Sequence, residues 1–358
     1  MKGIILAGGL GTRLRPISHT GPKQLVPIAN KPVLHYIIED IKNAGITEIG
    51  IIVGYTKDRI QKIIDSCGDG SKWNVKITYI EQDAPRGLAH AVSITKDFIK
   101  DDNFVVYLGD NILKEGINNF VEKFKKSNAE ASILLCNVDN PQKYGVAVLE
   151  GNEVINVEEK PENPKSNLAI VGVYLFKKNI FDIIKQVNPG KGGELQLTDA
   201  IEIMINSNDH KVEAHIVTGW WDDTGTTGAV LRANHLVLAD LEEKRYGEIE
   251  EGVSITGKVS IGKNSIIKEG SVIKGPIIIG NNCKIGPNSY VGPYTSIGDN
   301  TEITNGEIES SIIVGDCKIN FNQKIVNSLI GRHSKLIYEN KLPKGHKLVL
   351  GENSEVIL

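Results

Sequence analysis

Apolar positions in the first part of the chain alternate between the period of strands and the period of helices. The short run from Gly3 to Ala7 predicts a buried strand. Residues 32–45 carry apolar side chains at helical spacing, with proline near the start and glycine at the end, which predicts a helix. Further strands are expected at 49–53, 75–80 and 104–108, and further helices at 57–65 and 89–99. This alternation predicts right-handed βαβ units and a mostly parallel α/β sheet.

The next part of the chain is richer in strands. Apolar runs at 131–138, 144–150, 153–159 and 168–176 predict four of them. Helices are expected at 179–186 and 197–206, then a strand at 212–217 and a closing helix at 226–241. Charged residues at 242–252 predict a linker, so the first domain is expected to span 1–241.

After Gly252 the hydrophobic pattern changes to a period of six. Isoleucine or valine recurs at every sixth position: Ile255, Ile261, Ile267, Ile273, Ile279, Ile285, Val291, Ile297 and Ile303. Small or β-branched residues stand two positions earlier, and glycine often follows. This is the hexapeptide repeat of a parallel β-helix, with one inward residue on each side of a triangular coil. We expect it to span 253–341, with a tail at 342–358.

Composition narrows the functional classes. The chain has 358 residues, 40% of them hydrophobic, and a formal net charge of -3, so no basic surface argues for nucleic acid. Four separated cysteines form no C-x-x-C pair and are expected to be reduced. No apolar run is long enough for a signal peptide or a membrane span, and we expect a cytoplasmic protein.

A glycine loop follows the first strand and is the main chemical signal. Gly8, Gly9 and Gly11 leave backbone amides open to an anion, and the cations Arg13 and Lys23 follow. The spacing matches neither a P-loop nor a complete dinucleotide fingerprint. Taken alone, these residues leave a phosphate site and a plain tight turn as alternatives.

The longer string L-A-G-G-x-G-T-R-L-x-P, followed by P-K, resembles the signature of the sugar-1-phosphate nucleotidylyltransferases. Over nearly the whole chain the sequence resembles the glucose-1-phosphate thymidylyltransferases in their longer form. The resemblance implies a Rossmann-like nucleotidyltransferase domain followed by a left-handed β-helix. It also implies Mg²⁺-dependent transfer from dTTP to α-D-glucose 1-phosphate, giving dTDP-glucose and pyrophosphate for deoxysugar synthesis, for example of rhamnose.

The same resemblance assigns site residues, which fall into four groups. The implied catalytic residues are Arg13, Lys23, Asp110, Lys160 and Asp223. The implied nucleotide-binding residues are Leu6, Gly8, Gly9, Gly11, Thr12, Arg13, Lys23, Gln82, Gly87 and Asp110. The implied sugar-phosphate site contains Tyr144, Gly145, Glu159, Lys160, Ile170, Gly172 and Glu194. Asp110 and Asp223 are the implied magnesium ligands.

This residue set suits the implied chemistry. The attacking group is already a phosphate anion, so the site must supply cations and metal more than an activated base. Simpler readings exist: Asp110 could cap a turn, Arg13 could form a surface ion pair, and Lys160 could be solvated. Asp222 competes with Asp223 for the metal role, and the position of Asp223 directly before Thr224-Gly225 favours Asp223.

Several alternatives remain open at this stage. UTP could replace dTTP, because uracil and thymine differ by one methyl group, worth about 1–3 kcal/mol in a pocket. A non-catalytic regulatory subunit and a bifunctional nucleotidylyltransferase/acetyltransferase are the other candidates. We expect the β-helix to serve assembly into a homo-oligomer, with a trimer favoured. Because every assigned residue precedes Glu251, a chain ending there is expected to fold and retain activity.

Overall fold

The computed structural model describes residues 1–207 and 210–338, so the predicted tail at 342–358 lies outside the described residues. Two compact units share the chain. The first contains Met1–Leu10 and Val33–Asp222. The second contains Gly11–Pro32 and the chain from Asp223 onward. The loop after the first strand therefore belongs to the same unit as the C-terminal repeats.

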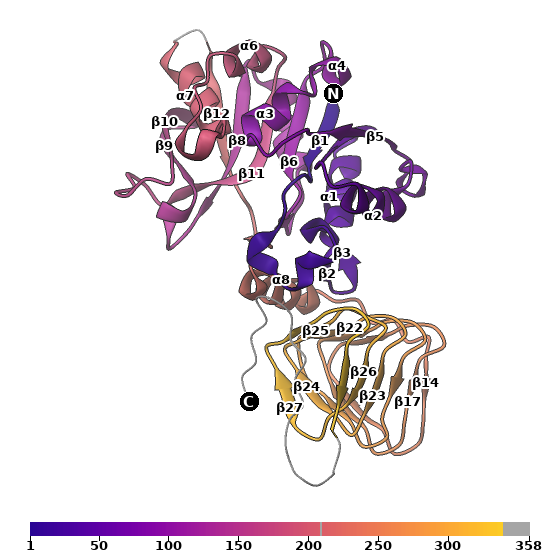
Figure 1. Cartoon of the computed structure of the whole chain (residues 1–358). Coiled ribbons are helices and arrows are strands. Elements are labelled where there is room, and N and C mark those ends of the chain that lie inside the picture. The colour runs from indigo at the N-terminus through magenta and orange to yellow at the C-terminus, as the bar shows by residue number, and fades with distance from the viewer. Residues whose placement is uncertain (208–209, 339–358) are drawn as a thin grey trace. The chain divides into compact units, whose positions relative to one another are not determined.

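A nine-stranded sheet forms the centre of the first unit (Figure 1). Its parallel half contains four strands in the order β5 (Lys76–Glu81), β4 (Glu48–Val53), β1 (Lys2–Leu6) and β6 (Phe104–Leu108). Every residue of β1 is buried, as expected for a strand flanked on both sides and covered on both faces. The predicted α/β fold and these four strands are confirmed.

The other half of the sheet is mixed. It contains β11 (Leu168–Phe176), β8 (Ala131–Asn137), β12 (Val212–Ile216), β10 (Glu153–Glu159) and β9 (Gly145–Glu150). Strand β11 runs antiparallel to both β6 and β8, and only β12 and β8 pair in parallel here. The antiparallel pair β9–β10 carries residues of the candidate sugar site.

Helices of the first unit bury the apolar faces that their periodicity predicted. Helix α1 (Val33–Asn43) buries Val33, Leu34, Ile37, Ile38 and Ile41. The other helices are α2 (Lys57–Cys67), α3 (Leu88–Ser93), α4 (Lys96–Ile99), α5 (Asn118–Lys126), α6 (Ile180–Ile184) and α7 (Leu197–Asn206). Helices α3, α6 and α7 pack with the central strands into one hydrophobic core.

One predicted helix is divided in two. The expected helix at 89–99 consists of α3 and α4, separated at Ile94 and Thr95. Thr95 is fully buried, and its Oγ1 donates a hydrogen bond of 2.7 Å to the carbonyl of Val92. A threonine side chain that bonds to the preceding turn competes with the helical ladder, which explains the break.

The C-terminal repeats of the second unit form a left-handed parallel β-helix of three parallel sheets (Figure 1). Its strands run from β14 (Glu248–Ile249) to β29 (Lys335–Ile337), and each pairs with the equivalent strand of the next coil. The inward series from Ile261 to Ile303 is buried, as the period of six predicted. Since β14 pairs with β17 (Ile266–Ile267), the first coil begins inside the segment expected as a linker.

The second unit also contains helix α8 (Thr227–Ala239) and the loop Gly11–Pro32. The helix is capped by Thr226, whose Oγ1 accepts a hydrogen bond from the Ala229 amide. The loop has three short 3₁₀ turns at Thr12–Leu14, Ile17–His19 and Lys23–Leu25, then a hairpin of β2 (Pro27–Ile28) and β3 (Lys31–Pro32). Among all described helices, none has the length and apolar character needed to cross a membrane.

Candidate active site

Three predicted site residues follow strands of the parallel half of the sheet. Gly8 follows β1, Gln82 follows β5 and Asp110 follows β6. The backbone amide of Gln82 bonds to the carbonyl of Val53 at 2.9 Å, and that of Gly109 to Leu6 at 3.0 Å, so the ladder continues to the start of these loops. Carboxyl ends of parallel strands are where ligands bind in such sheets. Leu6 is the buried last residue of β1, and Gly9 in the following loop is exposed.

Gly8 and Gly54 are glycines because neighbouring groups occupy the space that a Cβ would need. A Cβ at Gly8 would lie 3.1 Å from Gln82 Oε1, and one at Gly54 would lie 2.9 Å from the Gly8 carbonyl oxygen. The loop is held further along by Arg59, whose guanidinium donates to the Leu10 carbonyl at 2.8 Å. The first glycine and the candidate base-reading glutamine are thus in direct contact.

The amide of Gln82 is oriented by a histidine. Gln82 Nε2 lies 3.2 Å from Nδ1 of His90 in α3, and Gln82 is almost completely buried. The amide can therefore make a hydrogen bond to His90 while Oε1 faces Gly8. His90 stands eight residues after Gln82 in the segment EQDAPRGLAHA, and no local pattern in this segment indicates the bond.

Gly87 connects the candidate nucleotide and sugar regions. Its φ is +95°, and a Cβ there would lie 2.4 Å from the carbonyl oxygen of Leu195. The Leu195 amide bonds to Arg86 at 2.8 Å, and the Ala89 amide bonds to the Leu195 carbonyl at 3.0 Å. Only glycine permits this close approach. Glu194, the neighbour of Leu195, has an exposed carboxylate that accepts a hydrogen bond from Gln196.

Three predicted sugar-site residues converge around one carboxylate. A Cβ at Gly145 would lie 3.2 Å from Glu159 Oε2, 3.2 Å from Ile170 Cδ1 and 2.9 Å from Thr198 Cγ2. Thr198 Oγ1 also donates a hydrogen bond to Glu159 Oε2 at 3.1 Å. Thr198, at the start of α7, was missed from the sequence because it is distant from β9 and β10 along the chain.

Lys160 and Tyr144 lie beside this carboxylate. The ammonium of Lys160 is 3.2 Å from Glu159 Oε1, and its backbone amide bonds to the Tyr144 carbonyl at 3.0 Å. Lys160 has a left-handed φ of 45°, uncommon for a residue with a Cβ and therefore a sign of local constraint. Its side chain is exposed, with the cation available to a ligand.

A chain of contacts connects Tyr144 to Asp110. The rings of Tyr144 and Trp221 meet edge to face, with centroids 5.4 Å apart. Trp221 Nε1 donates to Asn111 Oδ1 at 2.6 Å, and Asn111 Nδ2 donates to Asp110 Oδ1 at 3.0 Å. Asn111 directly follows Asp110 and Trp221 directly precedes Asp222, but no local pattern indicates that Asn111 and Trp221 touch.

Packing between two strands explains why residue 172 is a glycine. A Cβ there would lie 2.6 Å from the Leu108 side chain, so the glycine allows β11 to pack against the end of β6. The expected contact between Gly172 and a sugar stays a prediction.

The remaining predicted residues belong to the second unit. Gly11 has a φ of +66°, and a Cβ there would lie 2.9 Å from Cβ of Lys23, so the two ends of this turn are in contact. Ser18 fixes the turn by donating to the Gly11 carbonyl at 2.6 Å. Thr12 begins the first 3₁₀ turn. This geometry presents Lys23 next to the glycine turn.

Arg13 and Asp223 share the space beside Gly225. A Cβ at Gly225 would lie 2.9 Å from Arg13 Nη2 and 3.8 Å from Asp223 Oδ1. The glycine of D-T-G therefore admits the guanidinium, a role that the sequence did not reveal. Asp222 is buried, whereas Asp223 is half-buried, so Asp223 is the more accessible of the two carboxylates.

Burial and charge around Glu159 shift neighbouring acids. Burial, with the Glu159 charge second, raises the pKa of the Asp199 carboxyl. The same two causes raise the pKa of the Tyr174 phenol. The Glu159 carboxylate, itself half-buried, thus lies close enough to both groups for its charge to raise their pKa values.

Two carboxylates, one in each unit, are of the kind that binds magnesium together with substrate. Within residues 1–207 and 210–338, no group of three or more histidine, cysteine, aspartate or glutamate side chains is arranged to hold a metal. Mg²⁺ typically uses one or two protein carboxylates together with substrate phosphates and water. Asp110 and Asp223, both half-buried, offer that kind of oxygen ligand.

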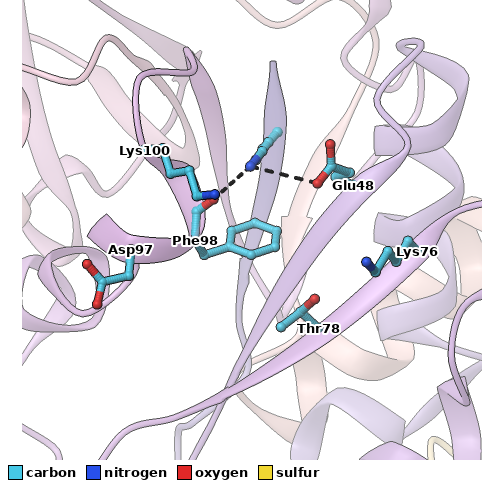
Figure 2. Close-up of a pocket in the computed structure, with 7 residues that line it drawn as sticks. Glu48, Lys76, Thr78, Asp97, Phe98 and Lys100 are labelled. Carbon is cyan, nitrogen blue, oxygen red and sulfur yellow. Dashed lines mark hydrogen bonds and ion pairs between the residues drawn. The ribbon is translucent and has the colours of Figure 1, made fainter.

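A pocket elsewhere in the first unit has a different character. It lies at the amino ends of β1, β4 and β5, and it is lined by Lys2, Glu48, Lys76, Thr78, Asp97, Phe98 and Lys100 (Figure 2). Lys2 is already engaged, because its ammonium donates to the Phe98 carbonyl at 2.8 Å and lies 3.7 Å from Glu48. None of the predicted site residues lines this pocket.

Comparison with known proteins agrees with the geometry. Residues 2–240 match the family model described as nucleotidyl transferase, and residues 273–357 match the GMPPB C-terminal domain. The chain is 47% identical to the low-salt glycan biosynthesis nucleotidyltransferase Agl11 of Haloferax volcanii, with 100% of both chains covered. It is 44% identical to a glucose-1-phosphate thymidylyltransferase of Streptomyces antibioticus, with 99% of both covered.

A solved structure is similar to part of the chain. It is a putative glucose-1-phosphate thymidylyltransferase from Bacillus anthracis, in complex with a sucrose, at 37% identity and a TM-score of 0.63. The match covers 68% of this chain and 98% of that one.

The family model and the relatives define the chain as a sugar-1-phosphate nucleotidyltransferase. The chain belongs to the nucleotidyl transferase family, and it is an enzyme of the class that transfers nucleotidyl groups to phosphate acceptors. The resemblance seen in its sequence to glucose-1-phosphate thymidylyltransferases is confirmed.

Proposed function

We propose that the enzyme transfers a thymidylyl group from dTTP to α-D-glucose 1-phosphate, giving dTDP-glucose and pyrophosphate. The observation that carries this proposal is the cluster of Gly145, Glu159, Lys160 and Thr198. It combines a half-buried carboxylate for sugar hydroxyls with an exposed cation for the sugar phosphate. The name of the Streptomyces antibioticus relative supports the same substrates.

Gln82 is proposed to read the base. A carboxamide offers one acceptor and one donor side by side, which complement N3–H and a carbonyl of thymine. The bond to His90 leaves the second Nε2 hydrogen available to the base. The backbone of Gly87, held against Leu195, forms a surface that can approach the base closely.

The proposed reaction is an in-line exchange at the α-phosphorus. An oxygen of the sugar phosphate forms a bond to this phosphorus as the bond to the pyrophosphate oxygen breaks. Arg13 and Lys23 neutralise the triphosphate and the leaving group, and Lys160 orients the attacking phosphate. Asp110 and Asp223 would hold Mg²⁺, which would offset phosphate charge when bound.

The deciding experiment is a matrix of nucleoside triphosphates against sugar 1-phosphates, measured as pyrophosphate release with Mg²⁺. We expect the highest kcat/KM for dTTP with glucose 1-phosphate. A preference for UTP by tenfold or more would replace thymidylyl with uridylyl transfer. No turnover with any pair would favour a non-catalytic, ligand-binding role.

A bifunctional enzyme is the second candidate, because of one relative. The chain is 43% identical to a bifunctional protein GlmU of Methanococcus maripaludis, covering 92% of this chain and 77% of that protein. Acetyl-CoA with an amino-sugar phosphate should therefore be included, with free thiol as the readout. We expect no thiol release.

We also propose a cytoplasmic homotrimer, since the nucleotide substrates are cytoplasmic and the β-helix offers flat faces for self-association.

A further inference from the structure

A buried asparagine in the second unit joins the loop Gly11–Pro32 to the β-helix. Asn234 of helix α8 is fully buried. Its Oδ1 accepts from the Ala29 amide at 2.9 Å and from Ser296 Oγ at 2.7 Å, and its Nδ2 donates to the Tyr294 carbonyl at 3.1 Å. Ala29 belongs to the loop, whereas Ser296 and Tyr294 belong to the β-helix.

The chemistry of these partners determines the orientation of the amide. A backbone N–H can only donate and a backbone carbonyl can only accept. Oδ1 must therefore face Ala29, and Nδ2 must face Tyr294. Neither aspartate nor leucine can satisfy both partners, and a buried polar group left without a bond is costly.

The loop has two further contacts with the β-helix. Asn30 Nδ2 donates to the Ile297 carbonyl at 2.7 Å, directly after Ser296. At the other end of the loop, a Cβ on Gly331 would lie 3.3 Å from Ile17 Cδ1, so this isoleucine packs on the last coils. Lys23 stands between Ile17 and Ala29 in the sequence, with β-helix contacts on both sides of it.

The turn of the β2–β3 hairpin has an unfavourable backbone conformation that these contacts stabilise. Ala29 and Asn30 both have left-handed backbone angles, with φ of 45° and 62°. Consecutive left-handed residues with side chains are unfavourable and persist where surrounding contacts hold them. The hydrogen bonds that Ala29 donates to Asn234 and Asn30 donates to Ile297 hold the turn in this conformation.

We propose that the β-helix is part of the nucleotide-binding apparatus, and that Asn234 is a positioning residue for the loop that presents Arg13 and Lys23. The inference rests on the proposed function of those two cations. It assigns the C-terminal repeats a role in substrate binding besides assembly. The coupling passes through hydrogen bonds within the second unit.

The test compares Asn234→Asp and Asn30→Ala with the control Asn282→Asp in the full chain. Asn282 lies in an exposed ladder of asparagines on the β-helix, donating to Asn300 at 3.1 Å and accepting from Asn264 at 3.2 Å. The control therefore makes the same chemical change in the β-helix of the same unit without touching the loop. KM for each substrate and the melting temperature are measured for all three.

For Asn234→Asp we expect the KM of the nucleotide to rise about tenfold or more, while the KM of glucose 1-phosphate changes little. Asn30→Ala should give a smaller rise in the same direction and keeps the test valid if Asn234→Asp does not fold. The control should leave both KM values unchanged. Equal rises in both KM values, or an unchanged nucleotide KM in the two loop variants, would overturn the proposal.

Hydrogen–deuterium exchange separates this inference from the proposed function. Without substrate, the amides of residues 17–30 should exchange faster in Asn234→Asp than in the wild type and the control. Unchanged exchange would overturn the positioning role even if the enzyme is active. Faster exchange in a protein that fails to use any nucleotide would refute the proposed function and leave the structural coupling intact.

Discussion

Asp110 stands at one end of a contact chain that includes Asn111, Trp221 and Tyr144. Asp110→Asn would remove the negative charge while keeping the shape that Asn111 contacts. If the carboxylate holds Mg²⁺, kcat should fall by a factor of about 100 or more, with an unchanged melting temperature. Asp101→Asn is the control, since this exposed aspartate pairs only with Lys178 at the surface. Near-normal turnover of Asp110→Asn at saturating Mg²⁺ would exclude it as a metal ligand.

Glu159 gives a separate prediction for the sugar side of the site. Glu159→Gln retains an acceptor for Thr198 but weakens charge-assisted bonds to sugar hydroxyls, worth about 1.5–3 kcal/mol. The KM of glucose 1-phosphate should therefore rise about tenfold to a hundredfold, with little change in the KM of dTTP. Glu153→Gln, at the exposed start of the same strand, should change neither. Steady-state kinetics with each substrate varied in turn would decide the matter.

Lys23 gives the corresponding prediction for the nucleotide side of the site. Lys23→Ala should raise the nucleotide KM and lower kcat, because the loss of a cation leaves triphosphate charge uncompensated. Initial rates with each substrate varied, set beside those of Glu159→Gln, test the division. If both variants affected only the nucleotide KM, the proposed separation of the two subsites would be wrong.

For single residues, the sequence identifies those that stand in motifs but not the residues that they contact in the fold. Gly8, Gln82, Asp110 and Glu159 stand in contiguous strings, so a family resemblance finds them. Thr198, Asn111, Trp221 and Gly225 matter because of contacts across the fold. Such contacts depend on how distant elements pack, which local pattern does not encode.

The turn between β5 and α3 allows a test of close backbone packing. Gly87 and Gly151 both have positive φ, but only Gly87 has neighbours that a Cβ would strike. Gly87→Ala should therefore lower the melting temperature by several degrees more than Gly151→Ala and reduce kcat/KM. Thermal unfolding and kinetics of the matched pair measure the difference. Equal losses of stability would mean that the backbone angle, and not the contact with Leu195, determines the cost.

Helix α8 gives a prediction about pH. Burial lowers the pKa of His235, whose ring stacks on Tyr294 at 4.7 Å. Because the pKa of His235 is lower in the folded protein, the unfolded chain binds a proton at this side chain more readily. His235 therefore lowers the free energy of unfolding as the pH falls below about 6.5. His235→Phe should make the unfolding free energy less sensitive to pH between about 6.5 and 5. Denaturant titrations at several pH values, with the exposed His333→Phe as control, would test this.

Elements with strong periodicity were predictable from the sequence, and irregular ones were not. The apolar face of α1 and the inward series of the β-helix follow from spacing alone. The break between α3 and α4 depends on a single threonine side chain, and α5 lies in a segment for which no element was expected. Strand β14 precedes the first residues of the six-residue repeat, so only its pairing with β17 identifies it as part of the β-helix.

The organisation of the whole chain differs from what the order of motifs suggests. Sequence places the glycine loop in the first domain, with the β-helix as a later addition. Contacts instead group Gly11–Pro32 with α8 and the β-helix, through Asn234 and Asn30. A chain ending near Glu251 would leave the Asn234 amide without Ser296 and Tyr294. We therefore expect such a truncation to lose most nucleotide affinity, contrary to the expectation from sequence.

The last prediction concerns the association of this chain into a homotrimer through its β-helix. The β-helix exposes apolar side chains, among them Val326 on β27 (Lys324–Val326) at 47% and Ile337 at 53%. Exposed apolar side chains on a flat β surface favour association with a second copy. Light scattering should give the mass of three chains of 39.1 kDa each. Val326→Lys should shift this mass toward the monomer, whereas Gln323→Lys, an exposed polar neighbour, should not. A wild-type monomer would refute assembly, and a trimer that persists in Val326→Lys and Ile337→Lys would move the interface to another surface.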